Sequence, residues 1–382
     1  MTHDPQPIFN TLDRHIPVAA PAAQLCVYHR GAPVLNVARG VLDPAAGTRP
    51  VTTETRFDLA SVTKLFVVTA FMRLVEQGAV MLDQPVTTVL PAFSGVRPIL
   101  PYEDPLNPGA WVDVAPTRGQ VDAATVTFQH LLTHTSGLPA WRPLFRETDA
   151  AAARELALTT FFSYPPGTRS VYSDIGLILL GMTVEELNGQ PLDTAVRDLV
   201  LTPLDLDATA YRPATFVDDG TCAPTEFCGW RGRRVVGAVH DENAFQLGGV
   251  AGHAGLFSTA ADVARFGQSF LDALHGHGEP ALLRVETVEA IVQPHAAAGD
   301  VRRGLGFALW SPDPEASGNP FSPHAFGHTG FTGTSLWIDP ARDLVVALLT
   351  NEVYNGRSAR NLIRLRLDVH RAVLQVIDPV AP

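Results

Sequence analysis

The chain has 382 residues, 46% of them hydrophobic, so it is long enough to bury a large core and, at roughly 150 residues per domain, to form two or three lobes. Its net charge of −11 comes from 28 basic and 39 acidic residues, with no run of Lys or Arg interleaved with aromatic residues. This balance argues against a nucleic-acid partner and favours a small-molecule substrate.

The N-terminal segment contains neither a basic cluster nor an apolar run, and Pro17 and Pro21 interrupt the apolar residues that follow it. We therefore expect no secretory signal peptide, which implies a cytoplasmic location. Residues 23–29 and 33–39 are predicted to be two strands that turn at Arg30. The sequence holds no run of about 18 or more apolar residues, so no membrane span is expected.

Apolar periodicity predicts that the middle of the chain is mostly helical. In chain order, we expect helices at residues 61–77, 127–134, 151–162, 174–188 and 260–274, and a closing amphipathic helix at 357–376. Three further strands are expected in the segments LGFALW, TSLWID and DLVVALLTN, which begin at residues 305, 334 and 343. Residues 91–124 are rich in Pro and Gly without periodicity, which predicts a long loop bordering a site.

Strands from the two ends of the chain cannot bury their faces alone, so we expect them to form one sheet. The predicted fold is α+β, with an antiparallel sheet of about five strands flanked by helices and with a mostly helical lobe inserted. Residues 1–60 and 300–382 would form a discontinuous sheet domain, and residues 61–299 would form the lobe. The active site is expected in the cleft between them.

The predicted helix at 61–77 is apolar on nearly every side, which is typical of a helix buried in the core. Ser61 and Lys64 break this pattern, and their spacing places them on one face of the first turn. A helix N-terminus disfavours a cation, so a lysine held there away from water is expected to have a lowered pKa and to accept the serine proton. Taken alone, S-x-x-K also fits a capping serine and a lysine that reaches the surface.

Two further polar motifs lie beside apolar segments. The sequence Y-S-D at 172–174 precedes a predicted helix, and H-T-G at 328–330 leads into a predicted strand. Each motif is a weak signal alone, because a tyrosine before a helix is usually a packing residue and a glycine after threonine is usually part of a turn. Their order in the chain after S-x-x-K is the stronger signal.

In this order and at these separations, S-x-x-K, Y-S-D and H-T-G resemble the serine β-lactamase and penicillin-binding protein family. The resemblance is to the branch that holds class C β-lactamases, D-alanyl-D-alanine peptidases and related esterases. It spans nearly the whole chain and includes LLTHTSGLP, YPPGTRSVYSDIGLILLG and TGTSLWIDPARDLVVALLTN. The segment GAVHDENAFQLGGVAGHAGLFSTAADVARF is similar to a subgroup of serine hydrolases and penicillin-binding-type proteins.

The resemblance implies a role for each matching residue. Ser61 matches the nucleophile, Lys64 its proton acceptor, and Tyr172 the residue that relays the proton to the leaving group. Asp174 stands where the family usually has Asn and would contact Lys64 and a substrate amide. The oxyanion hole would use the main-chain N–H groups of Ser61 and Phe331.

The third motif departs from the usual K-T-G. His328, Thr329, Gly330 and Phe331 are expected to bind substrate, with His328 in the place of the lysine. An imidazole with an ordinary pKa near 6.5 would be charged part of the time, so anionic substrates should bind better as the pH falls from about 8 towards 6. A nearby Asp174 carboxylate would raise that pKa further. The two departures from the family pattern, Asp174 in place of Asn and His328 in place of Lys, weaken the expectation of β-lactam or D-alanine specificity.

Other kinds of site have weaker signals. G-x-S-x-G, phosphate-loop and H-E-x-x-H motifs are absent from the sequence. The segment 240–242 (H-D-E) and His253 could hold a metal, but helix capping and loop hydrogen bonds explain them without one. The three cysteines at 26, 222 and 228 match neither a disulfide framework nor a zinc pattern and are expected to be buried or free thiols. We therefore expect no metal and no cofactor.

The predicted function is that of a metal-independent serine hydrolase that cleaves an ester or amide bond through an acyl-enzyme. The substrate remains open among short acyl esters, D-amino-acid peptides and β-lactams. A protein that binds β-lactams or muropeptides without turnover, or that deacylates slowly, is the alternative. The sequence does not predict the oligomeric state.

Overall fold

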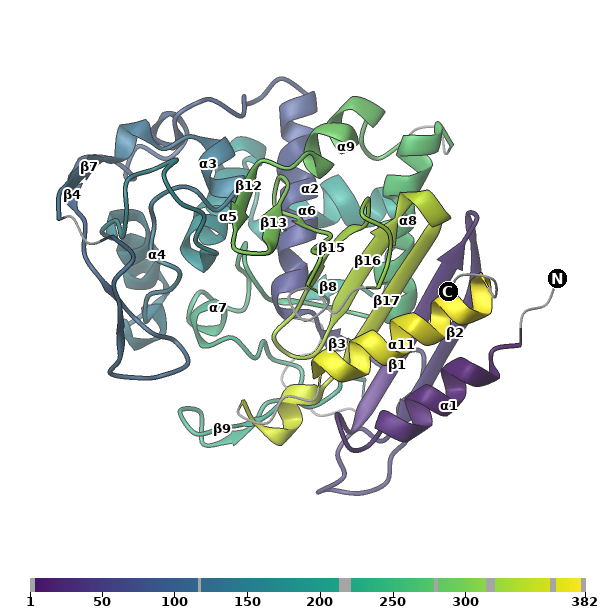
Figure 1. The fold of residues 1–382 in the computed structure, drawn as a ribbon. Helices are drawn as coiled ribbons and strands as arrows, with labels where there is room; N and C mark the ends of the chain where they lie inside the picture. The colour runs from purple at the N-terminus through teal and green to yellow at the C-terminus, as the bar shows by residue number, and fades with distance from the viewer. Residues whose placement is uncertain are drawn as a thin grey trace.

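The computed structural model describes residues 4–115, 118–212, 221–277, 281–313, 320–357 and 362–378. One antiparallel sheet organises them (Figure 1), with eight strands in the order β12-β13-β14-β15-β16-β17-β1-β2. The strands β1 (Ala22–His29) and β2 (Ala32–Gly40) come from the N-terminal end of the chain, and β1 pairs with β17 (Leu344–Thr350) near the C-terminal end. The prediction of one sheet built from both ends of the chain is therefore confirmed.

The expected number of about five strands was too low. The remaining strands of the sheet are β12 (Ala296–Ala298), β13 (Val301–Arg303), β14 (Ala308–Leu309), β15 (Phe326–Thr329) and β16 (Ser335–Asp339). The sequence did not indicate β12, β13 or β15, because each has at most four residues and none alternates between apolar and polar side chains. The H-T-G motif accordingly ends β15 and leads through a short turn into β16, the strand that was expected after it.

The central strand β17 is buried on both faces of the sheet. Its alternate residues belong to two separate apolar cores, with Val345, Ala347 and Leu349 on one side and Leu344, Val346 and Leu348 on the other. A strand covered on both faces has no polar side to present, which explains its uninterrupted apolar sequence.

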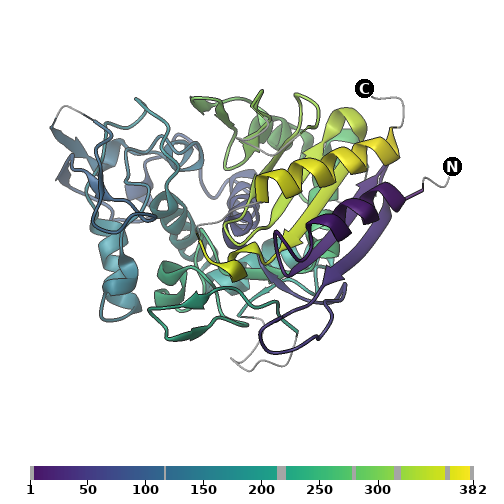
Figure 2. The same cartoon turned by 60° about the horizontal axis from the view of Figure 1, so that its bottom comes forward.

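Helices cover the two faces of this sheet (Figures 1 and 2). On one face, α1 (Gln6–His15) lies beside α11 (Leu362–Ile377). On the other, α8 (Ala260–His275) packs against β1, β16 and β17. Of the predicted closing helix, residues 358–361 lie outside the described residues. Because α8 belongs to the 61–299 stretch and yet packs on the sheet, the division into a sheet domain and a lobe stays a prediction.

The other helices lie mostly to one side of the sheet (Figure 1). In chain order they are α2 (Thr63–Glu76), α3 (Phe128–Leu132), α4 (Ala150–Thr159), α5 (Asp174–Asn188), α6 (Leu192–Val196), α7 (Glu242–Gln246) and α9 (Val285–Val292). The helix α2 packs against α5, and eleven of its fourteen residues are buried, as its apolar sequence predicts. None of the described helices is both long and apolar enough to cross a membrane.

Short strands occur outside the main sheet. A three-stranded sheet joins β3 (Phe57–Asp58), β11 (Leu256–Ser258) and β8 (Ala210–Tyr211). The other short strands form pairs: β4 (Val96–Pro98) with β7 (Gln120–Asp122), β5 (Tyr102–Glu103) with β6 (Trp111–Val112), and β9 (Phe227–Cys228) with β10 (Arg233–Arg234). Two of these pairs lie in the 91–124 stretch that was expected to be a loop. The small sheet matters most for the site, because its strand β3 leads directly to Ser61.

Candidate active site

The predicted nucleophile, Ser61, lies in a short 3-10 turn (Ala60–Val62) that leads into α2. The preceding Ala60 has a φ of 46°, a left-handed conformation that is strained for a residue with a side chain. The carboxylate of Asp58 accepts a hydrogen bond from the Ala60 N–H at 2.8 Å and thereby holds this turn. The Nζ atom of Lys64 donates to the Ser61 Oγ at 2.8 Å. The spacing in the sequence therefore corresponds to a direct contact.

Lys64 is completely buried, and its Nζ makes three short polar contacts. Besides Ser61, its Nζ lies 2.9 Å from Oδ1 of Asp174 and donates to the main-chain oxygen of His253 at 3.0 Å. Burial lowers the pKa of Lys64, but the Asp174 carboxylate and the adjacent Tyr172 outweigh it and hold the pKa above its ordinary value. The expectation of a lowered pKa was wrong, because it considered burial and the helix terminus without this ion pair.

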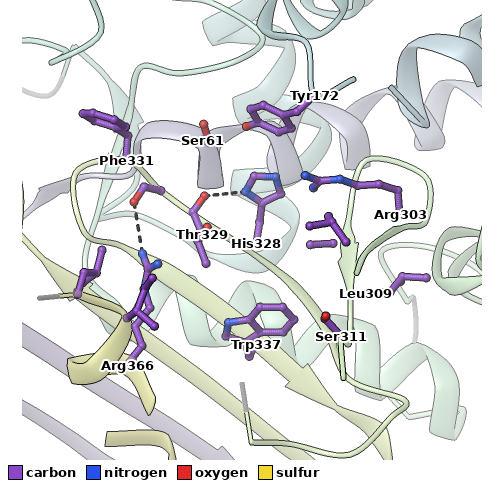
Figure 3. A pocket seen from close by; sticks show the side chains of 15 residues that line it. Ser61, Tyr172, Arg303, Leu309, Ser311, His328, Thr329, Phe331, Trp337 and Arg366 are labelled. Carbon is purple, nitrogen blue, oxygen red and sulfur yellow. Dashed lines mark hydrogen bonds between the residues drawn. The ribbon is translucent and has the colours of Figure 1, made fainter. Parts of the chain in front are cut away.

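Tyr172 lies just before α5, and its hydroxyl lines the pocket near Ser61 (Figure 3). This hydroxyl is buried and lies close enough to Lys64 to raise the pKa of that lysine. The Tyr172 ring packs between His134 and His328, with centroid distances of 4.7 Å and 5.8 Å. The Y-S-D segment is fixed locally, since the N–H of Ser173 donates to Nδ1 of His134 at 3.0 Å. The result is an oriented phenol beside the serine.

His328 does not have the charge that was expected of it. Its ring is buried, and its Nδ1–H donates to the main-chain oxygen of Thr329 at 2.7 Å. Burial, followed by the nearby cations of Arg303 and Lys64, holds the pKa of His328 well below its ordinary value. The predicted charge near neutral pH was therefore wrong, and so was the expected upward influence of Asp174. His328 is a neutral imidazole in the range where the lysine of K-T-G would be a cation.

Arg303 supplies a cation at this point instead. It comes from β13, and its guanidinium points towards His328 (Figure 3) and lies 5.0 Å from the centre of the Tyr172 ring. It lines the pocket and pairs with no carboxylate among the described residues. No motif surrounds Arg303, so only the pairing of β13 with β14 and of β14 with β15 reveals it.

The H-T-G turn is tied to the segment that carries Ser61. The hydroxyls of Thr332 and Thr334 donate to the main-chain oxygens of Asp58 and Leu59, at 2.7 Å and 2.9 Å. Gly330 permits this approach, because a Cβ there would lie 2.5 Å from the Leu59 oxygen. The two turns are thereby held together. The oxyanion hole that would use Ser61 and Phe331 stays a prediction.

These residues surround a cavity of about 430 Å³ (Figure 3). Ser61, Tyr172 and residues 328–331 line one end, while Lys64 and Asp174 lie behind the serine. The other end reaches Trp337, whose indole Nε1 is buried and makes no hydrogen bond with the described residues. All eight sequence-predicted site residues therefore come together, whereas Arg303 and Trp337 were not anticipated.

One group of described residues could offer ligands to a metal. Single ligand atoms of Asp174, Asp241 and His253 lie within 4.8 Å of one another. The Lys64 ammonium is already paired with Asp174 and supplies positive charge at this place. The rest of the H-D-E segment does not join the group, since residue 240 contacts Glu226 and residue 242 contacts Arg357. The absence of a metal or cofactor stays a prediction.

The chain is similar to known proteins over most of its length. A putative D-alanyl-D-alanine carboxypeptidase of Escherichia coli (strain K12) is 30% identical over 384 residues, covering 91% of this chain and 82% of the relative. An N-acetylmuramyl-L-alanine amidase of Bacillus subtilis (strain 168) is 33% identical over 374 residues, covering 89% of this chain and 79% of the relative.

Solved structures show the same fold. A penicillin-binding protein homologue from Caulobacter crescentus matches with a TM-score of 0.73 at 18% identity, covering 97% of both chains. EstCE1, a hydrolase with promiscuous acyltransferase activity, matches with a TM-score of 0.71 at 21% identity, covering 96% of this chain and 97% of EstCE1. A family model described as Beta-lactamase matches residues 12–371. The chain therefore belongs to the β-lactamase family of serine hydrolases, as its three motifs predicted.

Proposed function

We propose that the protein cleaves an amide or ester bond through an acyl-enzyme on Ser61, and that its preferred substrate is a D-amino-acid peptide with a free carboxylate. The contact of 2.8 Å between Lys64 Nζ and Ser61 Oγ, at the end of a cavity, carries the first part of this proposal. The unpaired guanidinium of Arg303 in the same cavity supports the second part.

The first chemical step needs a neutral amine at Lys64. In the resting site Lys64 is an ammonium paired with Asp174, because its pKa is raised. Transfer of one proton from Lys64 to the Asp174 carboxylate makes the amine neutral without releasing a proton to water. The amine then takes the Ser61 proton while Oγ attacks the substrate carbonyl carbon. This role for Asp174 goes beyond holding Lys64 and a substrate amide.

The second half of acylation needs a proton at the leaving group. As the bond from the carbonyl carbon to the leaving group breaks, the Tyr172 hydroxyl donates its proton to that group and recovers one from Lys64. The net result is the transfer of one proton from Ser61 to the leaving group, after which Lys64 and Asp174 return to their resting charges. Attack by water, with the same groups acting in reverse, releases the acid and frees Ser61.

Covalent labelling tests the nucleophile. Ser61→Ala should remove all labelling by a fluorophosphonate, whereas Ser136→Ala, in the nearby T-H-T-S-G segment, should leave it unchanged. Ser61 is the serine that contacts a lysine, while the Ser136 hydroxyl is buried and accepts a hydrogen bond from the Leu138 N–H. Intact-mass spectra measure the label, and a Ser61→Ala protein that still carries it would disprove the assignment.

A pair of peptides tests the substrate class. We expect a peptide that ends in D-Ala-D-Ala with a free carboxylate to react at least about tenfold faster, by kcat/KM, than the same peptide with an amidated end. Arg303→Met should remove most of this difference and leave the hydrolysis of an uncharged p-nitrophenyl ester unchanged. Equal rates for both peptides in the wild type would contradict carboxylate recognition and favour an esterase.

The raised pKa of Lys64 favours one alternative, a protein that binds β-lactams or muropeptides and deacylates slowly. A resting ammonium is a poor base for activating water, so the acyl-enzyme could accumulate. Burst kinetics distinguish the two functions. Release of one leaving group per chain, with the acyl group kept on Ser61 and no further release, would indicate a binding protein. A sustained steady state would indicate an enzyme.

A further inference from the structure

We propose that Asp241 and His253 form a positioning pair that holds the general-base lysine, Lys64, in register with Ser61. The proposal rests on the proposed roles of Ser61 and Lys64. It assigns a function to two residues, one in the H-D-E segment and one in the G-H-A-G segment, to which the three motifs give no role.

The pair acts through a main-chain oxygen. The carbonyl oxygen of His253 accepts a hydrogen bond from Lys64 Nζ at 3.0 Å, and only 1% of the His253 residue is exposed. In its side chain, Nε2 lies 2.9 Å from Oδ1 of Asp241. Because the side chain and the carbonyl belong to one residue, fixing the imidazole also fixes the oxygen that holds Lys64.

Asp241 is itself held in place by a helix. It is the N-cap residue of α7, and its Oδ1 accepts a hydrogen bond from the Ala244 N–H at 2.7 Å. The His253 contact thus connects a capped helix to the lysine. Because the same oxygen of Asp241 caps the helix and contacts the buried His253, the Asp241 side chain has little freedom to rotate.

The segment that carries His253 needs such a tether. Gly248, Gly249 and Gly255 have positive φ values of 85°, 81° and 124°, so the backbone on either side of His253 has little conformational restriction of its own. Gly252 packs against α5, where a Cβ would lie 2.0 Å from the main-chain oxygen of Leu177. The segment is therefore both glycine-rich and confined, and the His253 side chain ties its middle to α7.

Charge gives the pair a second purpose. Asp174 and Asp241 offer carboxylate atoms within 4.8 Å of each other beside the single ammonium of Lys64. Asp241 is half-buried, with 27% of its side chain exposed; burial raises its pKa, but its contacts with His253 outweigh this and hold the pKa well below the ordinary value, so it remains an anion. With its proton on Nε2, His253 satisfies Asp241, which leaves Asp174 as the partner of Lys64.

The rate of fluorophosphonate labelling tests this proposal without a known substrate. In the full-length protein, His253→Ala should lower the maximal labelling rate about 100-fold, because a small displacement of a base costs about this much. The concentration that gives half of the maximal rate should change less than about twofold, since neither residue lines the cavity. His253→Gln keeps an N–H donor for Asp241 and should recover at least about tenfold of the loss.

A matched control separates positioning from general stability. His15 and Asp368 make the same kind of contact, at 2.9 Å, between α1 and α11, and neither residue lines the cavity. His15→Ala should label as fast as the wild type. Thermal unfolding of each variant shows whether it is folded, and Asp241→Asn, which retains an oxygen acceptor for the helix cap, provides a second variant if His253→Ala does not fold.

The outcomes differ for the two proposals. If the wild type is not labelled on Ser61, the proposed function fails. If the wild type is labelled and folded His253→Ala, or Asp241→Asn in its place, is labelled at the same rate, the positioning pair is disproved. A uniform loss in His253→Ala and His253→Gln without rescue would likewise disprove it, because the donor to Asp241 would then be irrelevant.

Discussion

Lys64 and His328 are two buried bases at one cavity, and their pKa values move in opposite directions. For both, burial is the largest influence and lowers the pKa. Lys64 lies 2.9 Å from Asp174, and this carboxylate with Tyr172 reverses the effect. His328 instead meets the cations of Arg303 and Lys64, which lower its pKa further. The difference teaches that the nearest charged partner, more than burial, decides the charge of a base in this site.

The largest expected effect is at the lysine of this comparison. Lys64→Arg should lower kcat/KM by at least about 10³-fold, since arginine keeps the positive charge but does not release a proton near neutral pH. Steady-state hydrolysis of a p-nitrophenyl ester measures the loss. Activity close to the wild type would show that Lys64 needs only to be a cation and serves as a structural partner of Asp174.

Removing the Asp174 carboxylate should lower the pKa of Lys64, so that it shifts in the same direction as the pKa of His328. In Asp174→Asn the largest influence that raises the Lys64 pKa is lost, while burial and Tyr172 remain, so that pKa falls below the wild-type value. Lys64 must then release its proton to water, so activity is lost as the pH falls through the Lys64 pKa. We expect kcat/KM of the variant to fall at least about tenfold between pH 9 and pH 6.

The wild type provides the control for this profile. Its proton moves within the Lys64–Asp174 pair, so kcat/KM should stay within about twofold over the same range. An equally flat profile in Asp174→Asn would show that Asp174 accepts no proton during the reaction.

Trp337 offers an uncharged buried N–H donor in the same cavity, in contrast to the two bases Lys64 and His328. Trp337→Phe keeps an aromatic ring and removes the Nε1–H that has no partner among the described residues. For a substrate with an oxygen that reaches this donor, KM should rise about threefold to tenfold, the range expected for one hydrogen bond. A matched substrate with a methylene in place of that oxygen should show no change. Equal effects on both substrates would indicate lost packing and not a lost hydrogen bond.

The smallest expected effect concerns His328. Because its pKa lies well below the ordinary value, His328 gains no charge as the pH falls from about 8 to 6. Any substrate binding or stability that required a protonated His328 would be gained only at lower pH. The ratio of KM for anionic and amidated peptides should therefore change less than about twofold over this range. His328→Gln should give the same ratio. A several-fold rise in the binding of the anionic peptide towards pH 6 would show that His328 is charged in this range.

Several features of the site could be predicted because they depend on neighbours in sequence. Ser61 and Lys64 meet through the geometry of one helical turn, so their spacing was enough to expect the contact. The apolar helix α2 and the two-sided burial of β17 follow from sequences without a polar face. The order of the three motifs then indicated the family, and with it the residues that gather at the cavity.

The charges of these residues could not be predicted, because each depends on a partner far away in the chain. Arg303 reaches His328 only because β13, β14 and β15 are neighbours in the sheet, and the short β13 has no pattern of its own. Lys64 acquires Asp174 and the His253 carbonyl from two other segments. The sequence by itself determined which chemical groups are present and which turn presents Ser61. The tertiary structure decided which of the buried bases carries a proton, because electrostatic energy depends on distances that only packing sets.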